Sequence, residues 1–221
     1  MTDFLEPNEI HSIIDSVSNI SHHPIRDTLL FKLMWQTGAR VTEAITLLPE
    51  HIGKTSVVMH NLKQVKRIRK KDLDKKGNLV TKTFRLHDKD AIKEVEITKE
   101  LCSELKQFCK DNKISDGEWV FQSNWRQEQH LSRFYVHNIL NKASQDAGVI
   151  RFGKKNVKTG GRYKGAWPHL LRHSTAMVLM NSTNNIRLVQ QHLGHANIQT
   201  TTIYAQATKG KLREAIDKID W

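Results

Sequence analysis

Three segments in the last quarter of the chain carry side chains of types that could do chemistry. The first reads Pro168-His169-Leu170-Leu171-Arg172-His173. On a helix, His169 and Arg172 share a face because residues three apart are neighbours. Histidine can accept a proton near neutral pH, and arginine offers a fork of donors that matches phosphate geometry. The segment therefore predicts a phosphate-binding cation beside a proton acceptor.

The other two segments add a second imidazole and a phenol. In Leu193-Gly194-His195 the glycine lets the chain turn sharply after a helix. Tyr204, in Ile203-Tyr204-Ala205, follows His195 by nine residues. Each segment is a weak signal by itself, since single histidines and tyrosines are more often structural, and Tyr135 and Tyr163 are competing tyrosines.

A further arginine precedes a short acidic turn in the N-terminal half, in Thr37-Gly38-Ala39-Arg40-Val41-Thr42-Glu43. Gly38 is placed to end one helix, and Glu43 lies in the first turn of the next, where it could form a capping contact. Taken alone, this pattern favours a corner between two helices whose arginine is solvated.

The charge of the chain indicates a polyanionic partner. Its 221 residues include 35 Lys and Arg against 23 Asp and Glu, a formal net charge of +12. Residues 61–85 hold ten Lys and Arg, and residues 151–172 hold seven with no acid. Because each neutralised phosphate releases a counterion, such patches favour nucleic acid binding. The alternative is a basic protein whose surface binds nothing in particular.

Composition excludes several other classes. With 38% hydrophobic residues the chain is too apolar to be wholly disordered, and no stretch approaches the roughly 18 apolar residues that span a bilayer. The N-terminus shows no secretory signal. Cys102 and Cys109, seven residues apart on an expected helix, are interpreted as core residues of a reducing compartment. We therefore expect a cytoplasmic, nucleoid-associated protein with no membrane contact.

The hydrophobic pattern predicts an α+β fold that is mainly α. Short strands are expected at 56–60 and 95–97, forming a small antiparallel sheet joined by a long, charged, mobile connection over about 61–93. Strands and helices do not alternate, so a doubly wound sheet is not expected. Helices are expected at 7–17, 26–36, from 42 through Leu48, from 98 to about 109, and at 132–147, 168–180, 186–193, 198–205 and 211–219.

Taken together, the motifs resemble the tyrosine recombinases, or phage-type integrases. The matching pieces are T-G-A-R-V-T-E at 37–43, H-L-L-R-H at 169–173, L-G-H at 193–195 and the I-Y-A tyrosine at 203–205. Their order and spacing also match, with 23 residues from Arg172 to His195. Several spaced motifs in order are far more specific than any one of them, and the resemblance covers nearly the whole chain.

The resemblance implies DNA cleavage without metal or cofactor. Tyr204 would attack the scissile phosphate and form a 3′-phosphotyrosyl bond, while Arg40 and Arg172 clamp the non-bridging oxygens. His169 and His195 would hydrogen-bond the phosphate, and His169 would also be a candidate for accepting the tyrosine proton. Glu43 would support these groups as a neighbouring carboxylate.

In the family, a lysine in the hairpin of the small sheet protonates the 5′-oxygen. Lys63, 23 residues after Arg40, is the first choice, Lys66 the second and Lys82 the third. The connection here is longer than the family's usual short turn, and it could order only on DNA. Most of its lysines are expected to follow the phosphates instead. The expected DNA-binding residues are Lys66, Arg67, Arg69, Lys70, Lys71, Lys154, Lys155, Lys158, Arg162 and Lys164.

The resemblance also sets expectations for domains and partners. Residues 1–221 would form a single catalytic domain without the separate N-terminal core-binding domain that family members usually carry. Residues 209–221 would form a C-terminal helix that docks on a neighbouring protomer in a tetramer on double-stranded DNA, although packing on its own domain is the alternative. Accessory DNA-bending proteins are further expected partners.

Two other functions and one other site remain open. A topoisomerase of type IB would use the same tyrosine to relax DNA without strand exchange, and an inactive relative would only bind DNA. An inactive relative would have no reason to keep the complete set of five polar residues, which are Arg40, His169, Arg172, His195 and Tyr204. His169 and His173, four apart, have a spacing that can bind zinc, but no third ligand is evident and we expect no metal.

Overall fold

The computed structural model describes residues 4–60, 65–73, 79–87, 92–123, 126–155 and 162–194, some of the strand residues by their main chain only. The described helices are α1 (Pro7–Ile20), α2 (Pro24–Thr37), α3 (Val41–Ile45), α4 (Lys99–Asp111), α5 (Arg133–Asp146), α6 (Pro168–Thr183) and α7 (Ile186–Leu193), with a 3₁₀ turn at Pro49–His51. The strands are β1 (Ser56–His60), β2 (Val65–Leu73), β3 (Leu79–His87), β4 (Ile92–Glu96), β5 (Gln122–Ser123), β6 (Arg126–His130), β7 (Phe152–Lys155) and β8 (Arg162–Lys164).

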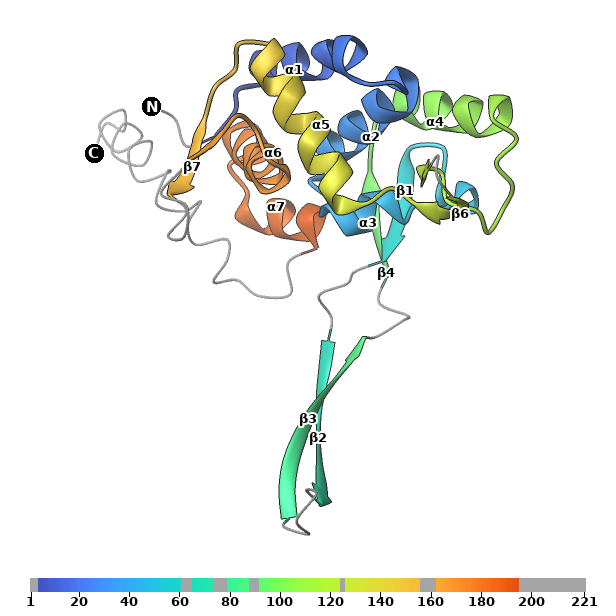
Figure 1. Cartoon of the computed structure of the whole chain (residues 1–221), viewed down its shortest axis with the longest axis vertical. Coiled ribbons are helices and arrows are strands. Elements are labelled where there is room, and N and C mark those ends of the chain that lie inside the picture. Colours follow the sequence, from blue (N-terminus) through green and yellow to red (C-terminus); the bar gives the residue numbers. More distant parts are fainter. Residues whose placement is uncertain are drawn as a thin grey trace, which may run out of the picture.

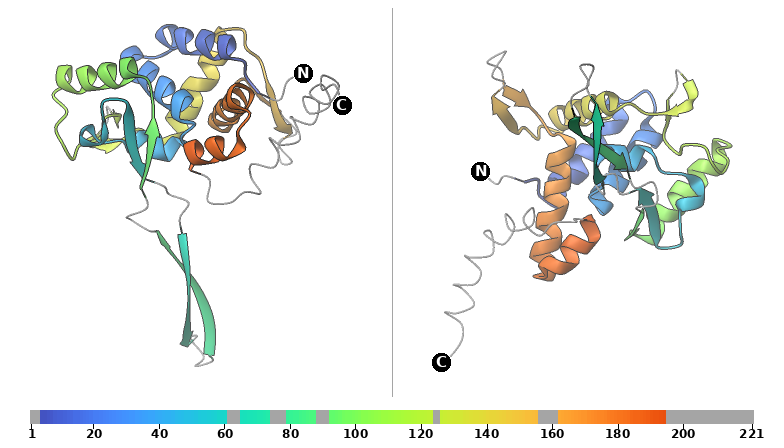
Figure 2. Two further views of the ribbon diagram at one scale, coloured as in Figure 1. Left: turned by 180° about the vertical axis from the view of Figure 1, so that it is seen from behind. Right: turned by 90° about the horizontal axis from the view of Figure 1, so that it is seen from below.

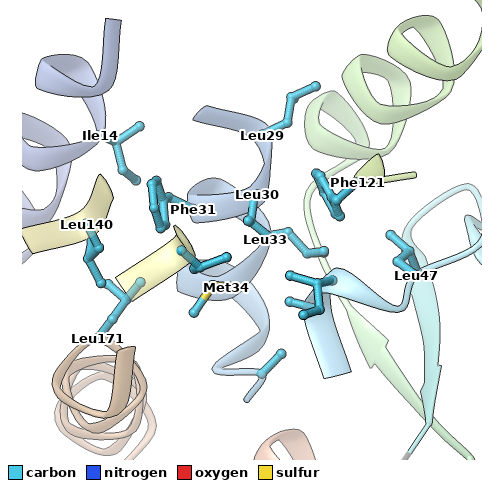
Figure 3. Packing of buried hydrophobic residues seen from close by; sticks show 14 of the residues in the cluster. Ile14, Leu29, Leu30, Phe31, Leu33, Met34, Leu47, Phe121, Leu140 and Leu171 are labelled. Atoms are coloured by element: carbon cyan, nitrogen blue, oxygen red, sulfur yellow. The ribbon is translucent and has the colours of Figure 1, made fainter. Parts of the chain in front are cut away.

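Helices build the body of the molecule, and α2 lies at its centre. It packs against α1, α4 and α6, and its apolar residues are buried on more than one side of the helix. Figure 3 shows Phe31 directed toward Ile14 and Leu140, and Leu33 directed toward Phe121. Each such side chain stabilises the fold by about 1.5–3 kcal/mol when fully buried. The core therefore holds α2 in place. Gly38 follows directly after the last residue of this helix.

The strands form four separate antiparallel pairs, β1–β4, β2–β3, β5–β6 and β7–β8. In the first pair Ser56 lies opposite Glu96 and His60 opposite Ile92. β2 and β3 pair over nine residues each, from Val65 opposite His87 to Leu73 opposite Leu79. Figures 1 and 2 show this ribbon extending away from the helical body, beyond the end of the β1–β4 pair.

The mainly helical α+β fold predicted from the sequence is confirmed. The strand at 56–60 and the helix at 186–193 have the predicted bounds, and Thr98 caps α4 by accepting a hydrogen bond from the amide of Leu101. Cys102 and Cys109 are both buried on α4, as predicted. The helices predicted at 198–205 and 211–219 lie outside the described residues.

One prediction was wrong. The helix expected to run from Thr42 through Leu48 ends at Ile45, because Leu48 precedes Pro49 and takes an extended conformation. The basic connection over about 61–93 contains β2 and β3, which occupy 18 of its residues. Val65, Val80 and Phe84 favour strands, and Gly77-Asn78 is a turn signal between them.

Within the described residues, no helix combines the length and the apolar character that a membrane span requires.

Candidate active site

A cavity of about 270 Å³ lies where the α2–α3 corner meets the N-terminal ends of α5 and α6. Arg40, His169 and Arg172 all line it, although more than 120 residues separate the first of them from the other two. The structure thus brings together three of the residues that the motifs single out. The full lining is Ala39, Arg40, Val41, Thr42, Arg133, His137, Trp167, Pro168, His169 and Arg172.

Arg40 is held by a turn and a carboxylate. Gly38 ends α2 with φ of +57°, a conformation that glycine adopts without strain. Arg40 then occupies the N-cap position of α3, where its amide donates to Oε2 of Glu43 at 3.0 Å and its Nη1 donates to Oε1. The predicted capping contact of Glu43 is confirmed, but Arg40 is paired with it and is not simply solvated.

Arg172 is oriented by two main-chain carbonyls. Its side chain is buried on α6, where only 7% of the residue is exposed. Nη1 donates to the carbonyl oxygen of Gly38, and Nη2 donates to that of Leu193 at 2.9 Å. Because a guanidinium is planar, two bonds at different nitrogens fix its plane relative to the cavity.

His169 reaches the cavity from the start of α6. Trp167 is the N-cap of this helix, Pro168 is its first residue and His169 its second. His169 is exposed, whereas Arg172, one turn later, is buried. The two residues therefore share a helix face, as their spacing predicts. His169 lies at the solvent-exposed side of the cavity and Arg172 at its buried side.

Lys93 belongs to the same cluster, although the sequence analysis did not single it out. Its side chain is only 8% exposed, and Nζ lies 3.2 Å from Oε2 of Glu43. Nζ also donates to the Leu193 carbonyl oxygen at 3.4 Å. The alternation of β4 could have revealed it, because Lys93 shares a strand face with the buried Val95.

The charges of this cluster perturb its pKa values. Burial alone would raise the pKa of the Glu43 carboxyl, but Lys93 and Arg40 together lower it below its ordinary value. Burial lowers the pKa of Lys93, and the charges of Arg172 and Arg40 lower it further, against the opposing effect of Glu43. The Glu43 carboxylate thus has two cationic partners, whereas Lys93 has one carboxylate partner and two neighbouring arginines.

α5 contributes Arg133 and His137 to the cavity wall, and neither was a predicted site residue. Burial lowers the pKa of His137. Ser132 caps this helix by accepting a hydrogen bond from the amide of Tyr135. The wall therefore presents a second histidine and a third arginine beside the predicted set.

The structure describes the remaining predicted residues only in part. Lys63, Lys158, His195 and Tyr204 lie outside the described residues. Lys66, Arg67, Arg69, Lys70 and Lys71 belong to β2, Lys154 and Lys155 to β7, and Arg162 and Lys164 to β8. Lys164 is exposed. Among the described residues, His, Cys, Asp and Glu form no group of three that could hold a metal ion.

Comparisons with known proteins show the family and the fold of this chain. The phage integrase family matches residues 3–211. The tyrosine recombinase XerH of Campylobacter jejuni is 28% identical over 217 residues, covering 97% of this chain and 51% of that protein. The tyrosine recombinase XerA of Pyrococcus horikoshii is 27% identical over 216 residues, covering 97% and 60%. This chain thus spans between about half and three fifths of the length of these relatives.

Solved structures share the fold. The XerH site-specific recombinase bound to palindromic difH substrate superposes with a TM-score of 0.66 and 21% identity, covering 97% of this chain and 52% of that one. The catalytic domain of bacteriophage HP1 integrase gives a TM-score of 0.58 and 21% identity, covering 97% and 94%. The motifs, the fold and the family match over residues 3–211 agree, and the chain belongs to the phage integrase family, the tyrosine recombinases.

Proposed function

We propose that this chain is the catalytic domain of a site-specific DNA recombinase that cuts and rejoins DNA through a 3′-phosphotyrosyl intermediate. The observation that carries the proposal is the convergence of Arg40, His169 and Arg172 on one cavity. Two guanidinium groups and an imidazole at one cavity suit a tetrahedral phosphate whose negative charge grows during the reaction. XerH, with the same fold, has been crystallised on its difH DNA in a post-cleavage complex.

The proposed chemistry assigns one role to each group. The phenolic oxygen of Tyr204 attacks phosphorus, the bond from phosphorus to the 5′-oxygen breaks, and the 5′-strand leaves as a hydroxyl. His169 accepts the phenolic proton, and Lys63 donates one to the leaving oxygen. Arg40, Arg172 and His195 hold the non-bridging oxygens. Attack by a 5′-hydroxyl from a second duplex reverses the step and completes strand exchange.

The start of α6 supports the phosphate role independently of side-chain charge. Pro168 and His169, in its first turn, line the cavity. A helix of 16 residues presents partial positive charge at its N-terminus, which favours an anion there. The helix dipole and the side chains of the described residues therefore both support a phosphate-binding role for this cavity.

Double-stranded DNA is the proposed partner beyond the scissile phosphate. The β2–β3 ribbon carries Lys66, Arg67 and Arg69 on a strand that extends from the body (Figure 1). Phosphate contacts by such residues would account for the net charge of +12. We further propose that residues 209–221 dock on a neighbouring protomer to form a tetramer on DNA, assisted by DNA-bending proteins.

A covalent capture experiment tests the function without knowledge of the target site. The protein is mixed with a library of nicked suicide duplexes in chelating buffer, then denatured with detergent, and adducts are separated and sequenced. We expect a protein–DNA adduct from the wild type and none from Tyr204→Phe. An adduct that persists in Tyr204→Phe, or DNA binding with no adduct on any duplex, would overturn the proposal.

Plasmid assays separate recombination from the related relaxation chemistry. Once the captured site is known, a supercoiled plasmid carrying two copies of it should give recombinant products. Relaxed topoisomers without recombinants would indicate a topoisomerase-like enzyme instead, because relaxation needs no second duplex.

A further inference from the structure

Lys93 is a buried cation next to the predicted phosphate-binding residues, and no role in the proposed chemistry uses it. Lysine is almost never fully buried unless it is paired, and removing an ammonium from water costs several kcal/mol. Met59, opposite Lys93 in the β1–β4 pair, is also buried. An aliphatic residue would fill this position at lower cost if β4 needed only packing.

The contacts of Lys93 join two parts of the site. Nζ shares Oε2 of Glu43 with the amide of Arg40, at 3.2 and 3.0 Å. It also shares the Leu193 carbonyl oxygen with Nη2 of Arg172, at 3.4 and 2.9 Å. One ammonium group therefore touches a direct partner of Arg40 and a direct partner of Arg172.

This arrangement has an electrostatic consequence. The two arginines repel each other, and Glu43 is completely buried. With Lys93 beside it, Glu43 stays ionised and holds the guanidinium of Arg40. Without Lys93, Glu43 would lose one of its two cationic partners, and the Leu193 carbonyl one of its two donors.

We propose that Lys93 is a positioning residue that fixes Arg40 through Glu43 and Arg172 through the Leu193 carbonyl, so that both guanidiniums meet the same phosphate. This inference rests on the proposed recombinase function. It assigns Lys93 no contact with DNA and no proton transfer, which separates it from the role proposed for Lys63.

The test measures single-turnover adduct formation on a captured suicide duplex. Lys93→Met should lower the rate about 100-fold, the loss that a small misplacement of a reactive group can cause. Its DNA affinity should stay within about threefold, because a buried side chain makes no phosphate contact. Lys110→Met, which removes an exposed lysine of α4, is the matched control and should match the wild type. A Lys93→Met rate equal to the wild-type rate would overturn the inference.

A double-mutant cycle shows whether Lys93 acts through Glu43. Lys93→Met/Glu43→Gln should be no slower than the slower single variant, because both changes break the same connection. The double variant also neutralises the buried Glu43 carboxylate, which Lys93→Met alone deprives of its ammonium partner, so it supplies a second rate if Lys93→Met folds poorly. Rate losses that multiply would show independent roles and contradict the inference.

A modified substrate distinguishes positioning from proton donation. When sulfur replaces the 5′-bridging oxygen, the leaving group departs as a thiolate and needs no proton, since thiols have a pKa near 8.5. Lys93→Met should remain slow on this duplex, whereas Lys63→Met should recover. Recovery of Lys93→Met would make Lys93 the proton donor and overturn the positioning role. A wild type that forms no adduct would instead refute the proposed function itself.

Discussion

Nη2 of Arg172 donates a 2.9 Å hydrogen bond to the carbonyl oxygen of Leu193, the last residue of α7. Gly194 follows in a left-handed conformation, with φ of +64°, and His195 comes next in the chain. Arg172 is therefore bonded to the main chain two residues before His195. Its other terminal nitrogen bonds the Gly38 carbonyl, two residues before Arg40.

This relationship predicts that lysine cannot replace Arg172. A lysine ammonium is a single point of charge and does not reproduce a planar fork that reaches two carbonyls. We expect Arg172→Lys to lower single-turnover adduct formation by at least about 100-fold, as loss of a transition-state donor does. Arg187→Lys, an exposed change on α7, is the control. Similar rates for both variants would show that only the charge of Arg172 matters.

Gly38, in the turn between α2 and α3, has no room for a side chain. A Cβ on this residue would overlap Cδ2 of Leu193 and lie 3.3 Å from Cγ2 of Thr175. Gly38→Ala therefore adds overpacking, about 1–3 kcal/mol, to the cost of a left-handed alanine, roughly 1–2 kcal/mol.

Gly148→Ala provides the comparison for Gly38→Ala. Gly148 has φ of +69°, and a Cβ on it would meet no atom within 4 Å, so alanine there adds backbone strain alone. Urea unfolding should show a larger loss of unfolding free energy for Gly38→Ala than for Gly148→Ala. Equal losses would mean that Leu193 moves aside without cost.

Much of this architecture follows from local patterns in the sequence. Glycine at 38 and 194 marks helix ends, and Pro168 marks a helix start. Arg40 and Arg172 could be assigned to one site only through the family resemblance, because the local pattern around Arg40 alone favours a solvated arginine. Local patterns suffice where a residue's conformation depends on its immediate neighbours.

Lys93 shows what such patterns miss. It lies in a stretch of balanced charge, and an isolated lysine is normally solvated. Its burial depends on Glu43 and Leu193, which are 50 and 100 residues away in the chain. Alternation with the buried Val95 places Lys93 on the inward face of β4, but it does not identify these partners.

A buried ionic network fixes α5, which carries two residues of the cavity wall. Asp27 is 1% exposed and accepts hydrogen bonds from Nε of Arg26 at 2.8 Å and from the Tyr135 hydroxyl at 2.6 Å. Asp27→Asn removes the carboxylate from a buried arginine, and we expect a loss of about 3 kcal/mol in unfolding free energy.

Two further variants test that assignment by urea unfolding. Tyr135→Phe removes one donor to a charged acceptor and should cost about 1.5–3 kcal/mol, the value of such a bond. Asp15→Asn, an exposed change on α1, should stay within about 0.5 kcal/mol of the wild type. If Asp27→Asn is no more destabilising than Asp15→Asn, the network does not hold α5.

His192 makes stability depend on pH. Its Nε2 lies 2.7 Å from the Gln36 carbonyl oxygen, and burial, together with the charges of Lys93 and Arg172, lowers its pKa below 6.5. As pH falls below about 6.5, the unfolded chain binds a proton that the folded chain does not. The unfolding free energy should therefore decrease toward acid pH, by at most about 1.4 kcal/mol per pH unit for this residue. His23 and His137, with pKa values also lowered by burial, act in the same direction.

The variant His192→Gln tests this prediction, because glutamine keeps a donor for the Gln36 carbonyl but cannot titrate. Urea unfolding between pH 7.5 and 5.5 should show a smaller decrease in unfolding free energy for this variant than for the wild type. Parallel curves for the two proteins would mean that His192 is protonated equally in the folded and unfolded chains.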